Sequence, residues 1–258
     1  MKVNVERIKL YRGTEYKYFA KDDGRIYFGV EFEYYIHEDD MLKGMTILVH
    51  VLNDITHIQH DETVTVELPT DPLEFTEDNI KEIQKRIVKI EKLRKYFKVY
   101  RMGCVSAHVH VTNPTPFVVP KDIIDTEERL KRAERKVNFK LFGRQWNKYA
   151  EPIFYASIFG DYPWICIPVN RPDEPTIEYR LPRIRTARQY AAVLRFIKNE
   201  LHPAIIERRE IDMSKQKEAW RTTKNVNVKI TKEDINSVRE IMRLYRLEEV
   251  ISQLKEEA

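Results

Sequence analysis

Hydrophobic and polar residues alternate with a period of two in several separate segments, which is typical of strands with one buried face. In FGVEFEYY, Val30, Phe32 and Tyr34 take one face, and Glu31 and Glu33 take the other. The same division recurs in TVTVEL, SAHVHV and TIEYRL, so each of these segments combines an apolar face with a face of charged or ligand-type side chains. Strands are predicted at 25–36, 46–51, 63–68, 98–112, 153–159, 164–169 and 176–181.

A period of three to four residues predicts helices between and after these strands. Because strands and helices do not alternate regularly, we expect an α+β fold with an antiparallel sheet and helices packed on one side. The predicted helices are 76–97 with Thr76 as N-cap, about 125–142 capped by Asp125 or Thr126 and ended by Gly143, 186–203 capped by Thr186 and ended by Pro203, and a tail that begins at a capping box formed by Thr231 and Asp234.

Composition adds a few limits to this picture. The chain has 258 residues, 42% hydrophobic and 33% charged, as expected for a globular protein. Its N-terminal residues do not resemble a signal peptide and no apolar run is long enough to span a membrane, so we expect a cytoplasmic location without a membrane partner. Cys104 and Cys166 lack metal-type spacing and are too few for a disulfide framework, and we expect both thiols to be buried.

The charge balance is mild, because 45 basic residues against 41 acidic ones give a net charge of +4. Basic residues gather at 208–232, where Trp220 is the only aromatic residue. We therefore interpret 208–232 as a solvated polar connection and do not expect a nucleic-acid partner. The predicted division is a catalytic domain at 1–203 and, at 204–258, this connection with a helical tail on the same domain.

The polar faces of the predicted strands contain residues that bind cations. If the strands form one sheet, seven side chains come together: Glu31, Glu33, Glu67, His108, His110, Glu178 and Arg180. Such a group of carboxylates is costly unless cations compensate it. Carboxylates with an occasional imidazole suit Mg²⁺ or Mn²⁺, which commonly bridge phosphate oxygens. Any one of these strands alone is more typical of a solvated sheet face, and recurrence in four strands favours a site.

At these residues the sequence resembles the putative amidoligase family, carboxylate–amine ligases with a catalytic domain of the glutamine synthetase and glutamate–cysteine ligase type. The resemblance covers about 28–201 and depends on five motifs in the family's order: FGVEFE, HDETVTVELPTDPL, GCVSAHVHV, FGRQWNKYA and VNRPDEPTIEYRLP. Ser106 stands where the family usually has glycine, and Thr63 where it has serine. We find no family counterpart for 204–258.

The resemblance implies a glutamine synthetase-like fold and an ATP-dependent reaction with Mg²⁺ or Mn²⁺. A carboxylate would be phosphorylated by ATP, and an amine would attack the acyl phosphate to give an amide. The resemblance implies two bound ions. One would be held by Glu31, His108 and Glu178, and the other by Glu33 and Glu67. The transferring phosphoryl group would be contacted by Arg180. His110, Arg144 and Asn147 would contact substrate or phosphate, and Arg183 and Arg185 are nearby candidates without a family counterpart.

Two other functions stay open at this level. The same cluster could activate water in a metal-dependent hydrolase, although the Glu-x-Glu and Glu-x-Arg pairing favours the ligase. A non-catalytic binding module that uses 208–232 is the other alternative. No P-loop, Rossmann glycine motif or nucleophile elbow is present. The sequence does not identify the carboxylate, the amine, or the oligomeric state.

Overall fold

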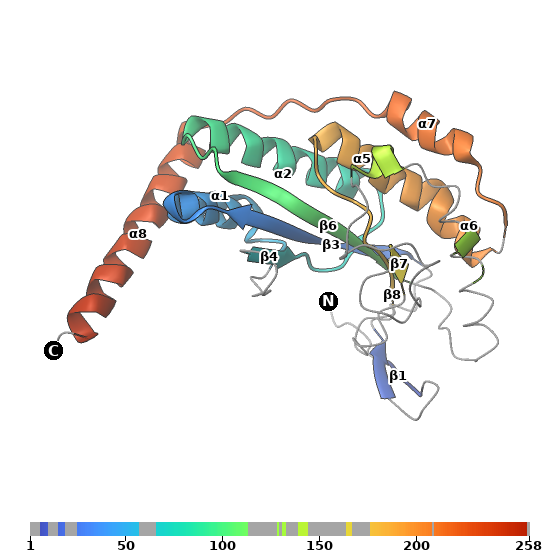
Figure 1. The fold of residues 1–258 in the computed structure, drawn as a ribbon, viewed down its shortest axis with the longest axis horizontal. Coiled ribbons are helices and arrows are strands. Elements are labelled where there is room, and N and C mark those ends of the chain that lie inside the picture. The colour runs from blue at the N-terminus through green and yellow to red at the C-terminus, as the bar shows by residue number, and fades with distance from the viewer. Residues whose placement is uncertain are drawn as a thin grey trace.

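The computed structural model describes residues 6–9, 15–18, 25–56, 66–112, 128, 131–132, 139–143, 164–166, 176–207 and 209–256. Within this part, the chain forms an α+β fold around one antiparallel sheet of six strands (Figure 1). The sheet order is β4-β3-β6-β8-β7, and β5 also pairs with β3. These strands are β3 (Tyr27–Ile36), β4 (Val66–Pro69), β5 (Leu73–Glu74), β6 (Met102–Thr112), β7 (Ile165–Cys166) and β8 (Thr176–Tyr179). A separate antiparallel pair joins β1 (Glu6–Lys9) to β2 (Glu15–Tyr18).

The centre of the sheet is the long pairing between β3 and β6. Glu31 lies opposite His108 and Glu33 opposite Ser106, but the next pair joins Tyr34 to Cys104, because the register shifts there. The extra residue of a β-bulge reverses the facing of the residues that follow it. Cys104 is therefore turned to the hydrophobic side, where it is buried as predicted.

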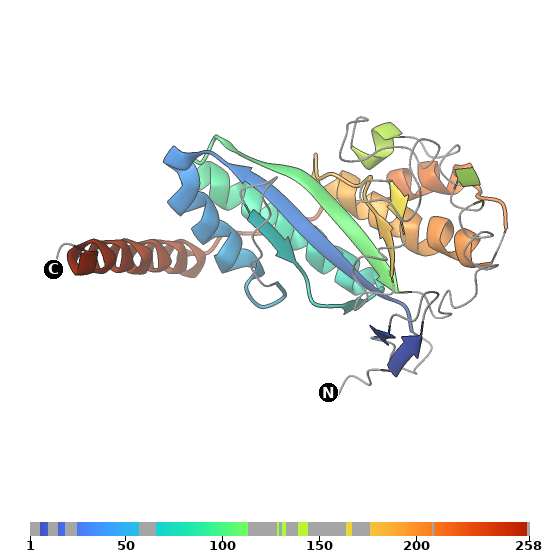
Figure 2. The ribbon, with the colours of Figure 1, turned by 60° about the horizontal axis from the view of Figure 1, so that its bottom comes forward.

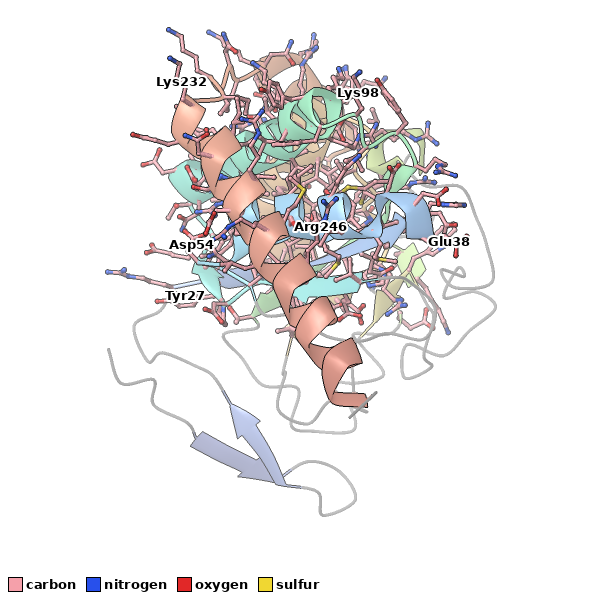
Figure 3. The ribbon with its side chains drawn as sticks, turned by 90° about the vertical axis from the view of Figure 1, so that its left-hand side faces the viewer. Tyr27, Glu38, Asp54, Lys98, Lys232 and Arg246 are labelled. Atoms are coloured by element: carbon pink, nitrogen blue, oxygen red, sulfur yellow. The ribbon has the colours of Figure 1, made fainter. Side chains whose placement is uncertain are left out.

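Helices cover one face of this sheet (Figure 2). They are α1 (Met41–Leu52), α2 (Glu77–Tyr96) and α5 (Ala187–Phe196), and α5 continues through the π-helical η2 (Ile197–Leu201) into α6 (His202–Ile206). The 3-10 turn η1 (Glu38–Asp40) precedes α1, and α4 (Phe139–Phe142) contacts α5. Two outer helices complete this layer: α7 (Met213–Thr222) lies against α5, and α8 (Lys232–Glu256) lies against α1 and crosses in front of it in Figure 3.

The hydrophobic core lies between the sheet and these helices. Phe32 and Val109 from the sheet, Leu48 from α1, Ile83 from α2 and Tyr190 from α5 are all fully or almost fully buried. The apolar faces that the alternation predicted are thus the faces that the helices cover. The polar faces of the same strands lie on the other side of the sheet.

Three of the predicted helix N-termini are confirmed by their capping contacts, and the cap predicted at Asp125 or Thr126 lies outside the described residues. The hydroxyl of Thr76 accepts a hydrogen bond from the Asn79 N–H at 3.2 Å, and that of Thr186 accepts one from the Gln189 N–H at 3.1 Å. Thr231 and Asp234 form the reciprocal capping box, with N–H to side-chain distances of 2.9 and 3.1 Å. Asp234 also joins α8 to the body, because its carboxylate lies 3.1 Å from His50 Nε2 and 2.5 Å from Lys89 Nζ.

Residues 46–51 are helical, so the strand predicted there is wrong. The segment TILVHV is a short apolar run, and such a run fits a buried helix as well as a strand. The buried positions of α1 begin at Gly44 and follow the helical period. A Cβ at Gly44 would lie 2.8 Å from Ile36 Cγ2, so the missing side chain lets α1 approach β3 closely.

Two further segments differ from prediction. Pro203 does not end the third helix, because the preceding π turn carries the chain into α6 and places Pro203 in its first turn, where no N–H is required. Within 208–232, the residues of α7 form a helix whose Gln216 and Ala219 are buried, so that part is not a solvated connection.

Other predicted elements lie partly outside the described residues. The strand at 153–159 does so entirely, as do residues 63–65 of the strand at 63–68. Residues 128 and 131–132 and α4 are helical, in agreement with the part of the predicted helix at 125–142 that can be compared. Gly143 follows α4 with φ 82°, a left-handed conformation that favours glycine at a helix end. Among the described residues, no helix has the length and apolar character needed to cross a membrane.

Candidate functional site

The polar face of the sheet gathers the ligand-type side chains of neighbouring strands. It comprises Glu31 and Glu33 of β3, Glu67 of β4, His108 and His110 of β6, and Glu178 and Arg180 at and just after β8. The register explains the convergence, because residues directly opposite one another in an antiparallel pair share a face. Glu31 lies opposite His108, Glu33 opposite Glu67, and His110 opposite Glu178.

His108 lies at the centre of this polar face. Its Nδ1 is 3.2 Å from Glu31 Oε2, 3.1 Å from Glu33 Oε1 and 3.3 Å from Glu178 Oε1. The imidazole is 2% exposed. Three carboxylates from two different strands therefore converge on one nitrogen. Such a cluster of oxygen and nitrogen atoms is suited to binding a cation.

His110 is turned differently from His108. Its Nε2 lies 3.0 Å from Glu31 Oε1 and 3.9 Å from Glu178 Oε1. Its other ring nitrogen, Nδ1, is 3.1 Å from the hydroxyl of Thr176 at the start of β8. The ring thus spans from a strand-end hydroxyl to the same two carboxylates that His108 approaches.

Glu67 and Arg180 lie on either side of these imidazoles. Glu67 faces Glu33 across the pairing of β4 with β3, which places two carboxylates next to each other. Arg180 donates a hydrogen bond from Nη1 to Glu178 Oε1 at 2.7 Å. The guanidinium is therefore fixed in orientation by a buried carboxylate at the edge of the cluster.

Two of these carboxylates, those of Glu31 and Glu178, are buried but are held in their charged form. Burial raises the pKa of Glu31, but the neighbouring His110 and His108 outweigh this effect and hold that pKa well below its usual range. The pKa of Glu178 is also lowered, because His110 and Arg180 together outweigh burial and the like charge of Glu31. Glu31 and Glu178, at 5% and 4% exposure, are therefore anionic side chains that can bind a cation.

The donor set fits divalent ions. Two groups have ligand atoms that all lie within 4.8 Å of one another: Glu31 with His110 and Glu178, and Glu31 with Glu33 and His108. On the polar face, four carboxylates lie beside one guanidinium and two imidazoles. Such an excess of buried negative charge is stabilised by divalent cations, and oxygen-rich donors with one imidazole suit Mg²⁺ or Mn²⁺.

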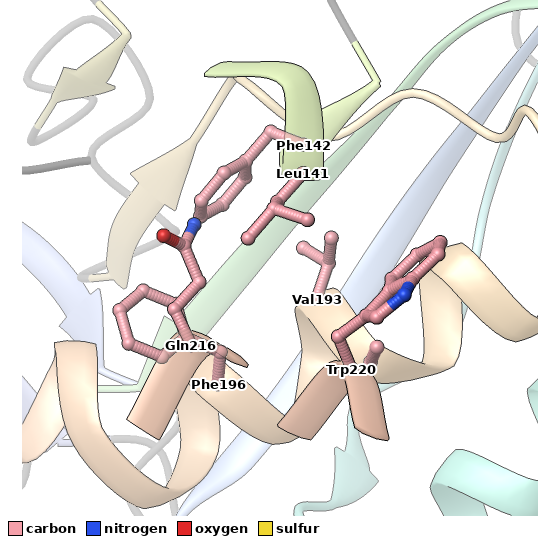
Figure 4. Close-up of a pocket in the computed structure, with 7 residues that line it drawn as sticks. Leu141, Phe142, Val193, Phe196, Gln216 and Trp220 are labelled. Atoms are coloured by element: carbon pink, nitrogen blue, oxygen red, sulfur yellow. The ribbon is translucent and has the colours of Figure 1, made fainter. Parts of the chain in front are cut away.

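Two other features of the described residues are weaker candidates. His37, Glu38 and Asp39 also form a group with metal-type spacing, but Glu38 and Asp39 are exposed and Asp39 is paired with Arg101. A pocket of about 10 Å³ is lined by side chains of α4, α5 and α7, among them Phe142, Val193 and Trp220 (Figure 4). This apolar pocket lies within the helical layer and holds at most about one water molecule.

The remaining predicted site residues are arginines and an asparagine. Arg144 and Asn147 lie outside the described residues. Arg183 donates from Nε to the backbone carbonyl of Cys104 at 3.1 Å, and Arg185 donates from Nε to that of Gly143 at 2.6 Å. Both arginines thus have contacts that support the backbone, and their predicted role in phosphate binding stays a prediction.

Sequence reasoning missed Thr176 and Ser106 as members of the polar face. Ser106 is fully buried, and Thr176 contacts His110. The alternation that identified Glu178 also places Thr176 on the same face, two residues earlier, so the signal was present in the sequence.

Comparisons with known proteins give little further information. Neither a protein-family model nor a curated protein matches the sequence. Among solved structures, the chain is similar to the crystal structure of the complex between prokaryotic ubiquitin-like protein Pup and its ligase PafA, with 12% sequence identity and a TM-score of 0.35. The similarity covers 85% of this chain and 51% of the matched chain, so this chain spans about half the length of that protein. A similarity at this level does not establish a shared activity.

Proposed function

We propose that this protein is an ATP-dependent carboxylate–amine ligase with a glutamine synthetase-like catalytic domain. The observation that carries the proposal is the convergence of Glu31, Glu33 and Glu178, from two strands, within 3.3 Å of the buried Nδ1 of His108 on a third strand. The order of the five sequence motifs supports the same family. The carboxylate and the amine, each a small molecule, a peptide or a protein, are left open.

The residues that would hold divalent ions are Glu31, Glu33, Glu67, His108 and Glu178. Bound there, Mg²⁺ or Mn²⁺ would neutralise the carboxylates and bridge phosphate oxygens of ATP. The carboxylates contribute by staying anionic in a buried site, which the lowered pKa values of Glu31 and Glu178 support. Because they come from strands of one sheet, little reorganisation is needed to keep them in place.

Arg180 is the residue that we assign to the transferring phosphoryl group. Its hydrogen bond to Glu178 orients the planar guanidinium fork on the polar face, beside the carboxylates that would hold the ions. Phosphoryl transfer is catalysed mainly by positioning and by charge stabilisation, and a preoriented guanidinium supplies both. His110, directly opposite Glu178 on the neighbouring strand, would contact substrate or phosphate from the same face.

Two measurements test this function. Calorimetry should detect ATP binding with Mg²⁺ and much weaker binding with EDTA, because the carboxylates repel the triphosphate through Coulomb energies of roughly 1 to 4 kcal/mol for each close charge pair. A screen of amino acids, polyamines and peptides should then show ADP release that depends on an added amine. Metal-dependent hydrolysis without ATP would instead indicate a hydrolase, and equal ATP affinity in both buffers would refute the ligase assignment.

A further inference from the structure

The two histidines of the polar face expose different ring nitrogens to the carboxylates. His108 presents Nδ1, whereas His110 presents Nε2, although both belong to β6 and share a face of the sheet. An imidazole can bind a cation only through a nitrogen that carries a lone pair, and the other nitrogen then carries the proton. The groups that face the two nitrogens therefore decide together which tautomer is present.

For His110 one of these groups is Thr176. The Thr176 hydroxyl lies 3.1 Å from His110 Nδ1, and the opposite ring nitrogen lies 3.0 Å from Glu31 Oε1. When a cation lies between Nε2 and the carboxylates, the hydroxyl can accept a hydrogen bond from Nδ1–H, which leaves the lone pair on Nε2 for the cation. The ligand atoms of His110, Glu31 and Glu178 then lie within 4.8 Å of one another.

The position of Thr176 makes it suited to this role. It begins β8 two residues before Glu178, and it pairs with Thr112 across the sheet as Glu178 pairs with His110. A strand backbone therefore fixes the hydroxyl relative to both the imidazole and a carboxylate. Hydrogen-bond partners of this kind orient metal-binding imidazoles and raise their basicity.

We propose that Thr176 is a positioning residue that holds His110 with Nε2 directed to Glu31 and Glu178, so that His110 is a cation ligand of this group. The inference rests on the proposed function, since it assumes that the polar face binds divalent ions. It goes beyond it in two ways. It gives His110 a ligand role where the sequence resemblance implies only substrate or phosphate contact, and it gives Thr176 a role that no sequence motif indicated.

The test compares divalent-ion binding by the full chain and three variants. Thr176→Val removes the hydroxyl at nearly constant volume, Thr176→Ser keeps it, and Thr112→Val is a matched control. Thr112 lies opposite Thr176, and its hydroxyl accepts a hydrogen bond from the Tyr27 N–H at 2.9 Å. Calorimetry with Mn²⁺ as the probe should show about 10- to 100-fold weaker binding for Thr176→Val, while the other two variants stay within about threefold of the natural protein.

The outcomes separate the two proposals. If the natural protein binds no Mn²⁺, both the proposed function and the positioning role are refuted. If it binds Mn²⁺ and Thr176→Val binds equally well, only the positioning role is refuted. A tautomer measurement needs no variant of Thr176. In ¹⁵N-histidine-labelled protein with Mg²⁺, the ring signals of His110, assigned by their loss in His110→Asn, should show a protonated Nδ1, and a proton on Nε2 would overturn the proposal.

Discussion

Replacing Glu67 by glutamine should have opposite effects on stability with and without divalent ions. Glu67 lies directly opposite Glu33, and both are buried. Two carboxylates about 5 Å apart repel by roughly 3 kcal/mol at an effective dielectric constant of about 20. After an allowance for the new amide's hydrogen-bonding cost, we expect Glu67→Gln to stabilise the ion-free protein by about 1 to 2 kcal/mol.

With ions bound, the natural protein should be more stable than Glu67→Gln. Free Mg²⁺ at about 100 times its Kd stabilises the natural protein by about 2.7 kcal/mol. If the loss of a ligand carboxylate weakens binding about 100-fold, the same concentration contributes only about 0.4 kcal/mol to the variant. The Mg²⁺-induced rise in Tm should therefore be smaller in Glu67→Gln by roughly 5 to 9 °C, since 1 kcal/mol corresponds to about 2 to 4 °C in a chain of this size.

The assay is thermal unfolding in EDTA and in a Mg²⁺ series. Glu74→Gln is the matched control, because Glu74 belongs to the same sheet but pairs with Arg25 at 38% side-chain exposure. The control should keep the natural Mg²⁺ shift. A Glu67→Gln protein that melts lower than the natural protein in EDTA and keeps the full Mg²⁺ shift would refute the assignment of Glu67 to an ion site.

Three further predictions concern other parts of the structure. Arg180→Lys should lower turnover about 10²- to 10³-fold with a smaller change in ATP affinity, because it keeps the charge but loses the planar fork that now contacts Glu178; a destabilised variant with intact turnover would contradict this role. Burial lowers the pKa of His202 to about 4, so the unfolded chain takes up this proton first as the pH falls. Roughly 3 kcal/mol of stability should then be lost between about pH 6.5 and 4, and urea titrations of His202→Gln should show a flatter pH dependence in that range. Asp234→Asn should cost about 1 to 3 kcal/mol and speed proteolysis of α8 at its start, because it weakens the contact with Lys89; unchanged cleavage would show that other contacts hold this helix.

Much of the polar face could be predicted from local sequence. A strand's side chains alternate strictly, so the facing of Glu31 with Glu33, and of His108 with His110, needed no knowledge of neighbouring strands. The helix starts at Thr76 and Thr186 were equally local, because a capping hydroxyl contacts an N–H only three residues away. In these cases the interacting groups lie within a few residues of each other along the chain.

Other features depended on contacts between distant residues. Residues 46–51 form an apolar run that is too short to distinguish a helix from a strand, and the continuation past Pro203 follows from the π turn before it. The bulge that turns Cys104 to the core is a property of the pairing of two strands. None of these can be read from periodicity, because each is stabilised by a partner far away in the chain or by a local departure from regular geometry.

Within a regular stretch of strand, the sequence by itself therefore determined which residues share a face, since that depends on backbone period alone. Only the tertiary structure decided which faces meet: the strand order brings Glu178 beside His110, and the register sets Glu33 against Glu67. It also decided how His110 is turned, because Nε2 lies 3.0 Å from Glu31 Oε1 while Nδ1 lies 3.1 Å from the Thr176 hydroxyl, 66 residues away along the chain. Long-range pairing is selected by the burial of the whole core, and no short segment carries that information.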